Sequence, residues 1–209
     1  MHTTAASSVS GAGAGLTMVL VSHPLTRPGA LGALVRSGVT LSAMRALYRG
    51  APIKTGAVTS AVCLGSFDVV RRGIERNQGG ERASPFEVAE AGLAAGALSA
   101  LLGDSRKLAS VSRTAISTGL FFGLSNFTRT RFFSQENATS VPALLAGGAV
   151  GGVVSEAARL VMEGAASAAK SPRSGPVVTA GLARQVMRSL PGTFSFVLTA
   201  SAIQKSMDV

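Results

Sequence analysis

Uncharged, largely apolar stretches alternate with short polar segments along the whole chain. The clearest polar segments are residues 77–82 and 134–140. We expect one helix in each apolar stretch, over residues 11–21, 55–71, 86–102, 114–128, 141–162 and 181–204. The pattern therefore predicts an all-α protein of six helices.

The length of the uncharged runs bears on whether these helices cross a membrane. A spanning helix needs about 20 mostly apolar residues. Only the first segment, within the charge-free residues 1–26, and the fifth offer charge-free runs near that length. The runs 55–67, 91–103 and 114–128 are shorter, so flanking Arg and Lys side chains must reach back to the interface. The segment 27–49 carries several arginines and is expected to lie at the membrane surface.

Small residues recur at helical spacing in alternate helices. The pairs are Gly11/Gly15, Gly92/Gly96 and Gly147/Gly151. Glycines four residues apart lie on one helix face and let membrane helices approach closely. Each such helix is followed by one that ends near a cation, at Arg71, Arg129 or Lys205. We therefore expect a single membrane domain, residues 1–209, of three helix-pair repeats at approximately 8–76, 86–133 and 140–207.

The composition supports a membrane protein. Only 14% of the 209 residues are charged, against about 25% in soluble domains. The net charge of +10 would suit a nucleic-acid-binding protein if the chain were soluble. The cations are not interleaved with aromatic residues and Trp is absent, so no nucleic-acid partner is expected.

No residues are spaced for catalysis or for metal binding. Cys63 is the single cysteine, which excludes an internal disulfide, and there is no Cys/His cluster. We see no nucleophile–base pair and no phosphate-binding loop, so we expect neither an enzyme nor a cofactor.

The charges are distributed unevenly between the two sides of the predicted membrane domain. Six spans place both termini on one side, where cations and acids balance. The excess of ten positive charges then lies on the other side, as the positive-inside rule describes. A basic face beside a membrane attracts anionic lipid, cardiolipin among them.

Two short motifs frame the second helix, Leu47-Tyr48-Arg49-Gly50 before it and Phe67-Asp68-x-x-Arg71 at its end. With them the chain resembles the mitochondrial carrier family. Further residues match that pattern: Pro24, Arg129 and Pro191. The resemblance implies six transmembrane helices in a pseudo-threefold bundle in the mitochondrial inner membrane, with both termini toward the intermembrane space.

The resemblance also implies where a substrate would bind. Counting back along the even-numbered helices, the family's contact positions fall near Thr55, Arg113 and Arg188. Two of the three are cations, as an anion carrier needs. The alternative is that Arg113 and Arg188 are helix-end cations on the basic side.

The chain departs from the family where carriers close their gates. In carriers, P-x-[DE]-x-x-[KR] ends each odd-numbered helix. Counted from the glycine pairs, the proline, acid and base positions of this motif can be located in each repeat. They are Pro24, Thr26 and Gly29 in the first repeat, Ser105, Lys107 and Ser110 in the second, and Leu160, Met162 and Ala165 in the third. No acid occupies this register, although a gapped one recruits Asp104 with Lys107 and Glu156 with Arg159.

The opposite gate is also incomplete. Its positions are Phe67, Asp68 and Arg71, then Ser125, Asn126 and Arg129, then Ala200, Ser201 and Gln204. We expect Asp68 to pair with Arg71 or with a cation of a neighbouring helix, because an acid at the membrane boundary is costly alone. Between Lys107 and Arg113 there is room only for a turn.

These observations favour a degenerate carrier-like protein that is a structural, lipid-contacting accessory subunit of an inner-membrane respiratory or ATP synthase complex. An alternative is a working carrier for an anionic metabolite. A third is a four-helix protein similar to the inner-membrane translocase family. Helix number distinguishes the third, and a transport assay distinguishes the first two.

Overall fold

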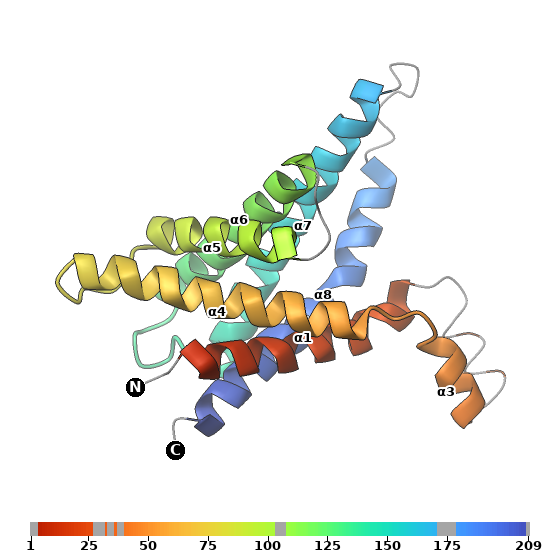
Figure 1. The fold of residues 1–209 in the computed structure, drawn as a ribbon, viewed down its shortest axis with the longest axis horizontal. Helices are drawn as coiled ribbons and strands as arrows, with labels where there is room; N and C mark the ends of the chain where they lie inside the picture. Colours follow the sequence, from red (N-terminus) through yellow and green to blue (C-terminus); the bar gives the residue numbers. More distant parts are fainter. Residues whose placement is uncertain are drawn as a thin grey trace.

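The computed structural model describes residues 4–26, 40–102, 108–170 and 179–207, together with Gly32 and Arg36. Within these residues the protein is all-helical, with six long helices and one short helix (Figure 1). The helices are α1 (Thr4–Thr26), α3 (Leu41–Leu47), α4 (Ile53–Asn77), α5 (Pro85–Leu102), α6 (Leu108–Phe132), α7 (Val141–Lys170) and α8 (Thr179–Met207).

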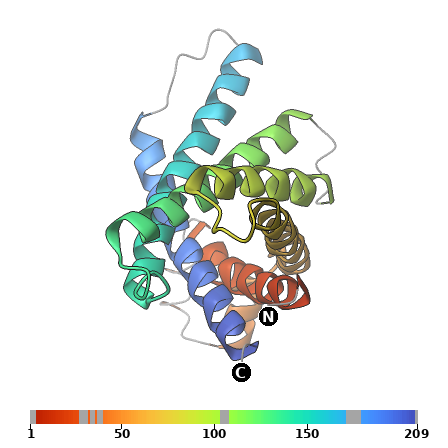
Figure 2. The same cartoon turned by 90° about the vertical axis from the view of Figure 1, so that its left-hand side faces the viewer.

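The six long helices form a closed ring in chain order. Each packs against the next, from α1 through α4, α5, α6 and α7 to α8, and α8 returns to pack against α1. Figure 2 views this ring from the end at which α1 begins and α8 ends. We call this the terminal end, and we call the end at which α1, α5 and α7 finish the distal end.

Glycines stand where neighbouring helices come closest. A Cβ on Gly92 of α5 would lie 2.9 Å from Gly119 Cα of α6, and one on Gly147 of α7 would lie 2.8 Å from Ser125 O. Gly11 and Gly15 of α1 similarly meet backbone oxygens of α4. A side chain at any of these positions would push the helices apart, so the small residues set the ring's diameter.

Side-chain hydrogen bonds join helices at several places. Thr17 Oγ1 of α1 lies 3.1 Å from Thr199 Oγ1 of α8, and Ser125 Oγ donates to Gly147 O at 2.8 Å. The Tyr48 hydroxyl donates to Leu20 O at 2.9 Å, which ties the turn after α3 to α1. In a membrane each such bond contributes about 0.6–2 kcal/mol.

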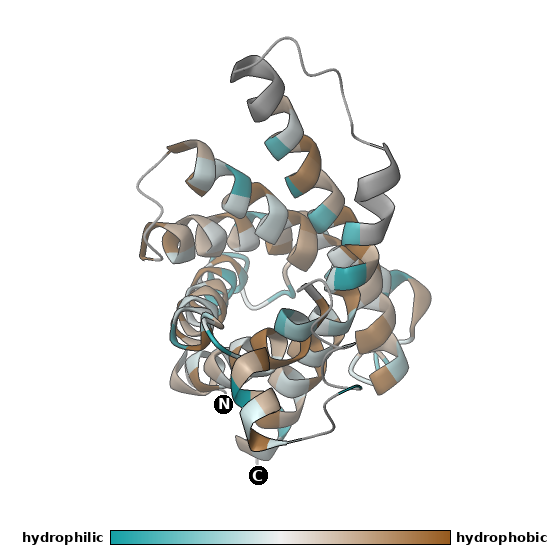
Figure 3. Cartoon of the chain, turned by 90° about the vertical axis from the view of Figure 1, so that its right-hand side faces the viewer, coloured by the Kyte–Doolittle hydropathy of each residue, from teal (hydrophilic) through white to brown (hydrophobic). Residues whose placement is uncertain are grey.

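Large apolar side chains point away from the ring along most of its helices. Exposed ones include Leu16, Val58, Leu93, Leu98, Ile116, Phe127, Val150 and Val153, and Figure 3 shows apolar residues along the helices. Four helices are long and apolar enough to span a membrane: Thr4–Leu25, Ile53–Asn77, Pro85–Leu102 and Val141–Ala165. The protein is therefore a multi-pass membrane protein.

The helices extend beyond the apolar runs that predicted them. The chain is helical from Leu108, so the expected turn between Lys107 and Arg113 is wrong. Ser112 and Thr114 there donate their hydroxyls to carbonyls one turn earlier, at 2.9 and 3.0 Å, which lets polar residues continue a helix. Of segment 27–49, the described part contains α3, which Thr40 caps by accepting from Ala43 N at 3.2 Å.

Candidate functional site: two cavities in the helix ring

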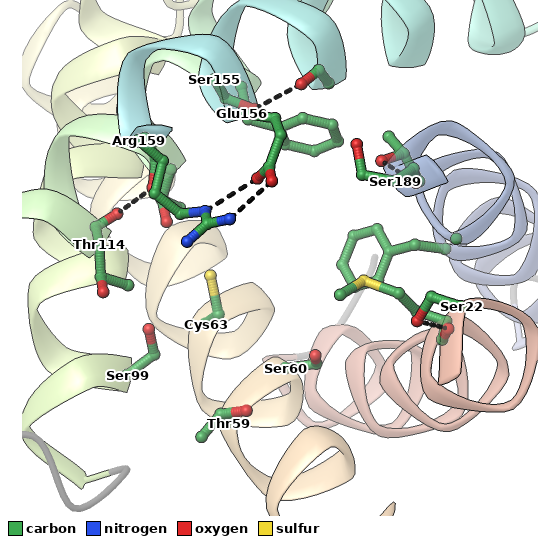
Figure 4. A pocket seen from close by; sticks show the side chains of 18 of the residues that line it. Ser22, Thr59, Ser60, Cys63, Ser99, Thr114, Ser155, Glu156, Arg159 and Ser189 are labelled. Atoms are coloured by element: carbon green, nitrogen blue, oxygen red, sulfur yellow. Dashed lines mark hydrogen bonds and ion pairs between the residues drawn. The ribbon is translucent and has the colours of Figure 1, made fainter. Parts of the chain in front are cut away.

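A cavity of about 920 Å³ lies inside the distal half of the ring and is lined by all six long helices. We call it the central cavity. Figure 4 shows Thr59, Ser60 and Cys63 entering it from α4, opposite Ser155 and Glu156 of α7. Other hydroxyl side chains in its lining are Ser22, Ser99, Thr114, Ser117, Thr118, Ser189 and Thr193. The cavity is therefore rich in hydroxyl groups but carries few charges.

The charged lining residues of the central cavity are Glu156, Arg159 and Arg188. Arg159 donates to both oxygens of Glu156, at 2.6 and 2.9 Å, and also to Glu163 one turn further. Arg188 has no ion pair or hydrogen bond within the described part of the chain. It is therefore the cation available to a ligand in this cavity.

The glycines of α7 pack against two different neighbouring helices. Gly11 and Gly15 of α1 face α4, the next helix, and Gly92 and Gly96 of α5 likewise face α6. On α7, however, Gly147 and Gly151 face the preceding helix α6, whereas Gly148 and Gly152 face α8. The third pair equivalent to the first two is thus Gly148/Gly152, one residue later than the sequence analysis assumed.

The cavity lining supports this shift independently. Met18, Ser99 and Ser155 all line the central cavity, and each follows Gly15, Gly96 or Gly152 by three residues. With Gly151 as the reference, the third residue would be Val154, which is exposed on the ring's outside. The repeats therefore align on Gly152.

The choice of glycine pair changes which residues the expected third motif contains. Counted from Gly152 instead of Gly151, its positions are Val161, Glu163 and Ala166 instead of Leu160, Met162 and Ala165, and Glu163 then takes the acid position. Glu163 lies 3.9 Å from Arg113 of α6. The sequence could not choose between the two counts, because Gly147/Gly151 and Gly148/Gly152 form two pairs, one on each face of α7.

The other motif positions lie differently. Glu156 and Arg159 of the gapped register pair within α7, whereas Asp104, Ser105 and Lys107 fall outside the described residues. Pro24 is buried in α1, and nothing is described of the side chain of Thr26. The distal end therefore contains one ion pair between helices, Arg113–Glu163, among the described residues.

A second cavity, of about 490 Å³, lies toward the terminal end, and we call it the terminal cavity. Its lining includes all three sets of the opposite motif: Phe67, Asp68 and Arg71; Ser125, Asn126 and Arg129; Ala200, Ser201 and Gln204. Positions far apart in the chain thus meet here in threefold correspondence.

Asp68 is buried and is held by its own helix. Arg72 donates to it at 3.0 Å (Nε to Oδ1) and lies 2.9 Å away at its second oxygen (Nη2 to Oδ2). The predicted pair with Arg71 is present at 3.8 Å, but Arg72, one full helical turn along, is closer. Arg129 donates to Ala138 O at 2.8 Å instead of to a carboxylate. Ion pairs here therefore lie within α4 and do not connect the described helices.

Phenylalanines separate the two cavities. Phe121, Phe122 and Phe196 line both of them. Phe122 stacks on Phe67 at 4.1 Å between ring centroids, and Phe121 meets Phe196 edge to face at 6.3 Å. The rings form a layer across the middle, which we call the aromatic layer, and it draws on α4, α6 and α8.

The predicted substrate-contact residues do not meet. Arg188 lines the central cavity, but Thr55 is exposed on α4 and Arg113 pairs with Glu163. Thr59, one turn after Thr55, lines the cavity instead. The helical period could have indicated Thr59, because residues four apart share a face.

The remaining motif residues are structural. Tyr48 stacks on His23 at 6.4 Å, and Gly50 has φ of 77°, a backbone conformation that favours glycine. Arg49 is exposed, and Pro191 lies exposed inside α8, beside Gly192, which packs on Ser22. These residues shape the turn before α4 and the contact of α8 with α1.

Comparisons with family models, curated proteins and solved structures find no match to this chain. Among the described residues, no three His, Cys, Asp or Glu side chains are grouped to hold a metal ion. The fold and cavities therefore define the class as a multi-pass helical membrane protein whose helix ring contains two cavities lined by both polar and apolar residues.

Proposed function

We propose that this is a degenerate carrier-like protein of the mitochondrial inner membrane, with a fixed shape and a structural role. In this proposal it is a lipid-contacting accessory subunit of a respiratory or ATP synthase complex. Support comes from the closed ring in chain order, and from the threefold correspondence of residues in both cavities. Both features fit the carrier resemblance of the Tyr48-Arg49-Gly50 and Phe67-Asp68 motifs.

Six spans are part of this proposal. The helices α6 and α8 have 25 and 29 residues, which is long enough to cross a bilayer, but they are not among the four helices whose composition is apolar enough to span one. Each packs between two apolar helices of the ring. Their hydroxyls bond back to the helix or face the cavities, so their polarity is compatible with spanning.

The pairing of Asp68 is the main observation in support of a fixed shape. A carrier of this kind, by resemblance, closes each gate with opposite charges from all three repeats. Here Asp68 pairs with Arg72 of its own helix, and Asn126 and Ser201 are neutral at the equivalent positions. Two alternating states need comparable stabilisation, and charge pairs that would close this end are missing among the described residues.

The lipid contact in the proposal is derived from charge. The net charge of +10 is assigned to the distal side by the six-span topology, which puts the basic face at the matrix and both termini in the intermembrane space. Anionic headgroups, cardiolipin among them, favour such a face. No cofactor is proposed.

A second candidate function is a carrier for an anionic metabolite, and the central cavity favours it. Its volume of about 920 Å³ lies within the ~300–1,000 Å³ typical of ligand sites. Arg188 and many hydroxyls could hold a small anion there. The two candidates differ in whether that anion crosses the membrane.

Uptake of labelled anions into proteoliposomes tests the two candidates. We expect no uptake above protein-free vesicles, and depletion of the protein should lower the amount of one large inner-membrane complex on native gels. Specific uptake that Arg188→Ala abolishes and Arg76→Ala retains would reject the structural role and establish the carrier. Arg76 is exposed at the other end of the ring and serves as the matched control.

A further inference from the structure

The terminal cavity contains more cations than carboxylates. Arg71, Arg129 and Lys205 line it from α4, α6 and α8, whereas Asp68 is the carboxylate among the described lining residues. The motif positions equivalent to Asp68 are Asn126 and Ser201. Two of the three acid positions and one of the three base positions, Gln204, are therefore neutral, and Lys205 beside Gln204 adds a third cation.

Asp68 cannot neutralise these three cations, because it is already engaged. Arg72, which does not line the cavity, donates to its Oδ1 at 3.0 Å and forms an ion pair at 2.9 Å with its Oδ2, which is buried without a hydrogen bond among the described residues. Arg71 has only long contacts, 3.8 Å to Asp68 and 3.8 Å to Glu75. Its Nε is buried without a hydrogen bond among the described residues.

The other two cations are less engaged still. Arg129 uses its Nε for Ala138 O, and its two terminal nitrogens have no partner within the described part of the chain. The positive charge of Arg71 is near enough to oppose that of Arg129. Lys205 likewise has no hydrogen bond or ion pair there. Like charges held together in one cavity are relieved by an anion.

The rest of the cavity suits such an anion. Asn126, Ser201 and Gln204 supply uncharged donors, and Lys205 and Thr139 are exposed at the mouth. The phenylalanines of the aromatic layer also line this cavity, and an apolar wall strengthens charge interactions beside it by lowering the local dielectric constant. The cavity volume of about 490 Å³ lies in the ~300–1,000 Å³ range of ligand sites.

We infer that the terminal cavity is a binding site for a phosphate-type anion, held by Arg71, Arg129 and Lys205. Arginine matches phosphate geometry with two parallel donors, and lysine adds a point charge. The anion is either free inorganic phosphate or the phosphate of an anionic lipid headgroup. The site requires neither transport nor a host complex, so it stands or fails separately from the proposed function.

Binding of inorganic phosphate to the delipidated protein in an uncharged detergent provides the test, with sodium chloride at equal ionic strength as reference. We expect phosphate to raise Tm and to give a calorimetric binding isotherm. Arg129→Gln should weaken phosphate affinity about tenfold or more. Arg131→Gln, the same charge change at an exposed position of the same helix outside the cavity lining, should change it less than about twofold.

Two further variants keep the test decisive. Lys205→Gln changes an exposed residue near the end of α8 and should weaken binding even if Arg129→Gln does not fold. Asp68→Asn removes the cavity's carboxylate and should preserve or raise phosphate affinity. Absence of phosphate binding to the unmodified protein, equal losses in the Arg129 and Arg131 variants, or a loss in Asp68→Asn as large as in Arg129→Gln would overturn the inference.

Nanodiscs distinguish the two sources of the anion. In discs of phosphatidylcholine alone, inorganic phosphate should bind as in detergent. If phosphatidic acid in the disc abolishes phosphate binding, and Arg129→Gln but not Arg131→Gln lowers retention of that lipid, the occupant is a lipid headgroup. If phosphate binds equally in both discs, the occupant is a soluble anion.

Discussion

The central and terminal cavities are built from the same helices but differ in their chemistry. In the central cavity, Glu156 and Arg159 satisfy each other, Arg188 is the remaining charged residue, and about half of the other lining residues carry a hydroxyl. In the terminal cavity, three cations face one carboxylate that is already bound by Arg72. The two ends of one ring thus carry different charge patterns.

The aromatic layer is the boundary that makes this comparison possible. Phe121, Phe122 and Phe196 contribute to both cavities. Because the layer lies between them, a change on one side can alter binding there without altering the other side. The predictions below test the helix packing around the cavities, this boundary, and the ion pair between α6 and α7.

The largest effect is expected at a glycine that supports the wall of the central cavity. Gly96→Leu should prevent α5 from packing on α6, because even a Cβ would lie 2.7 Å from Thr118 Cβ and 2.9 Å from Ala115 Cα. Size-exclusion chromatography in detergent should show loss of the folded monomer. Gly73→Leu, where no atom lies within 4 Å, is the control and should elute normally. Normal folding of the Gly96 variant would contradict the ring packing.

Breaking the aromatic layer should have the next largest effect. Phe122→Ala removes the ring stacked on Phe67 and joins the two cavities. We expect a loss of about 2–3 kcal/mol in the free energy of unfolding, because Phe122 is half-buried. Thermal and denaturant unfolding in detergent measure it. Phe132→Ala, exposed at the end of α6, should change stability by less than about 0.5 kcal/mol.

The separation can also be measured chemically. In a Cys63→Ser background, Ser155→Cys labels the central cavity and Ser201→Cys the terminal one. A membrane-impermeant thiol reagent applied from one side should react with one of them at least about tenfold faster, and the preference should reverse from the other side. Equal rates from both sides would show a continuous passage. Adding Phe122→Ala should reduce the difference.

The smallest effect concerns the register of the third repeat. Arg113 and Glu163 form an ion pair between α6 and α7 at 3.9 Å, with both side chains partly exposed. A double-mutant cycle of Arg113→Gln and Glu163→Gln should give a coupling of about 0.2–1 kcal/mol. The same cycle with Met162→Ala in place of Glu163→Gln should give no coupling, because Met162 is not the acid position.

The helices were predictable because they depend on local pattern. Apolar runs bounded by polar loops located all six long helices, with errors mainly at their ends, as at Leu108 and Met207. The glycine pairs of α1 and α5 indicated close helix contacts. Helical geometry alone predicts this, because residues four apart lie on the same helix face. Asp68 was expected to be paired because burying a lone charge is costly at any position.

Other features depended on which face of each helix meets its neighbour. Both Gly147/Gly151 and Gly148/Gly152 satisfy the same sequence rule, and only the packing of α7 between α6 and α8 assigns one pair to each side. The same rotation decides that Glu163 reaches Arg113, and that Thr59 instead of Thr55 faces the cavity.

The sequence by itself determined that the chain is helical, apolar enough for several membrane spans, and built with glycines where helices meet. Those properties follow from the period of the helix and from the cost of burying polar groups, which act within one segment. Only the tertiary structure decided the closure of α8 on α1, the two cavities and the unequal charges within them. These features depend on how each helix is rotated about its own axis, because that rotation decides which residues from distant parts of the chain face one another. No local sequence pattern specifies this rotation.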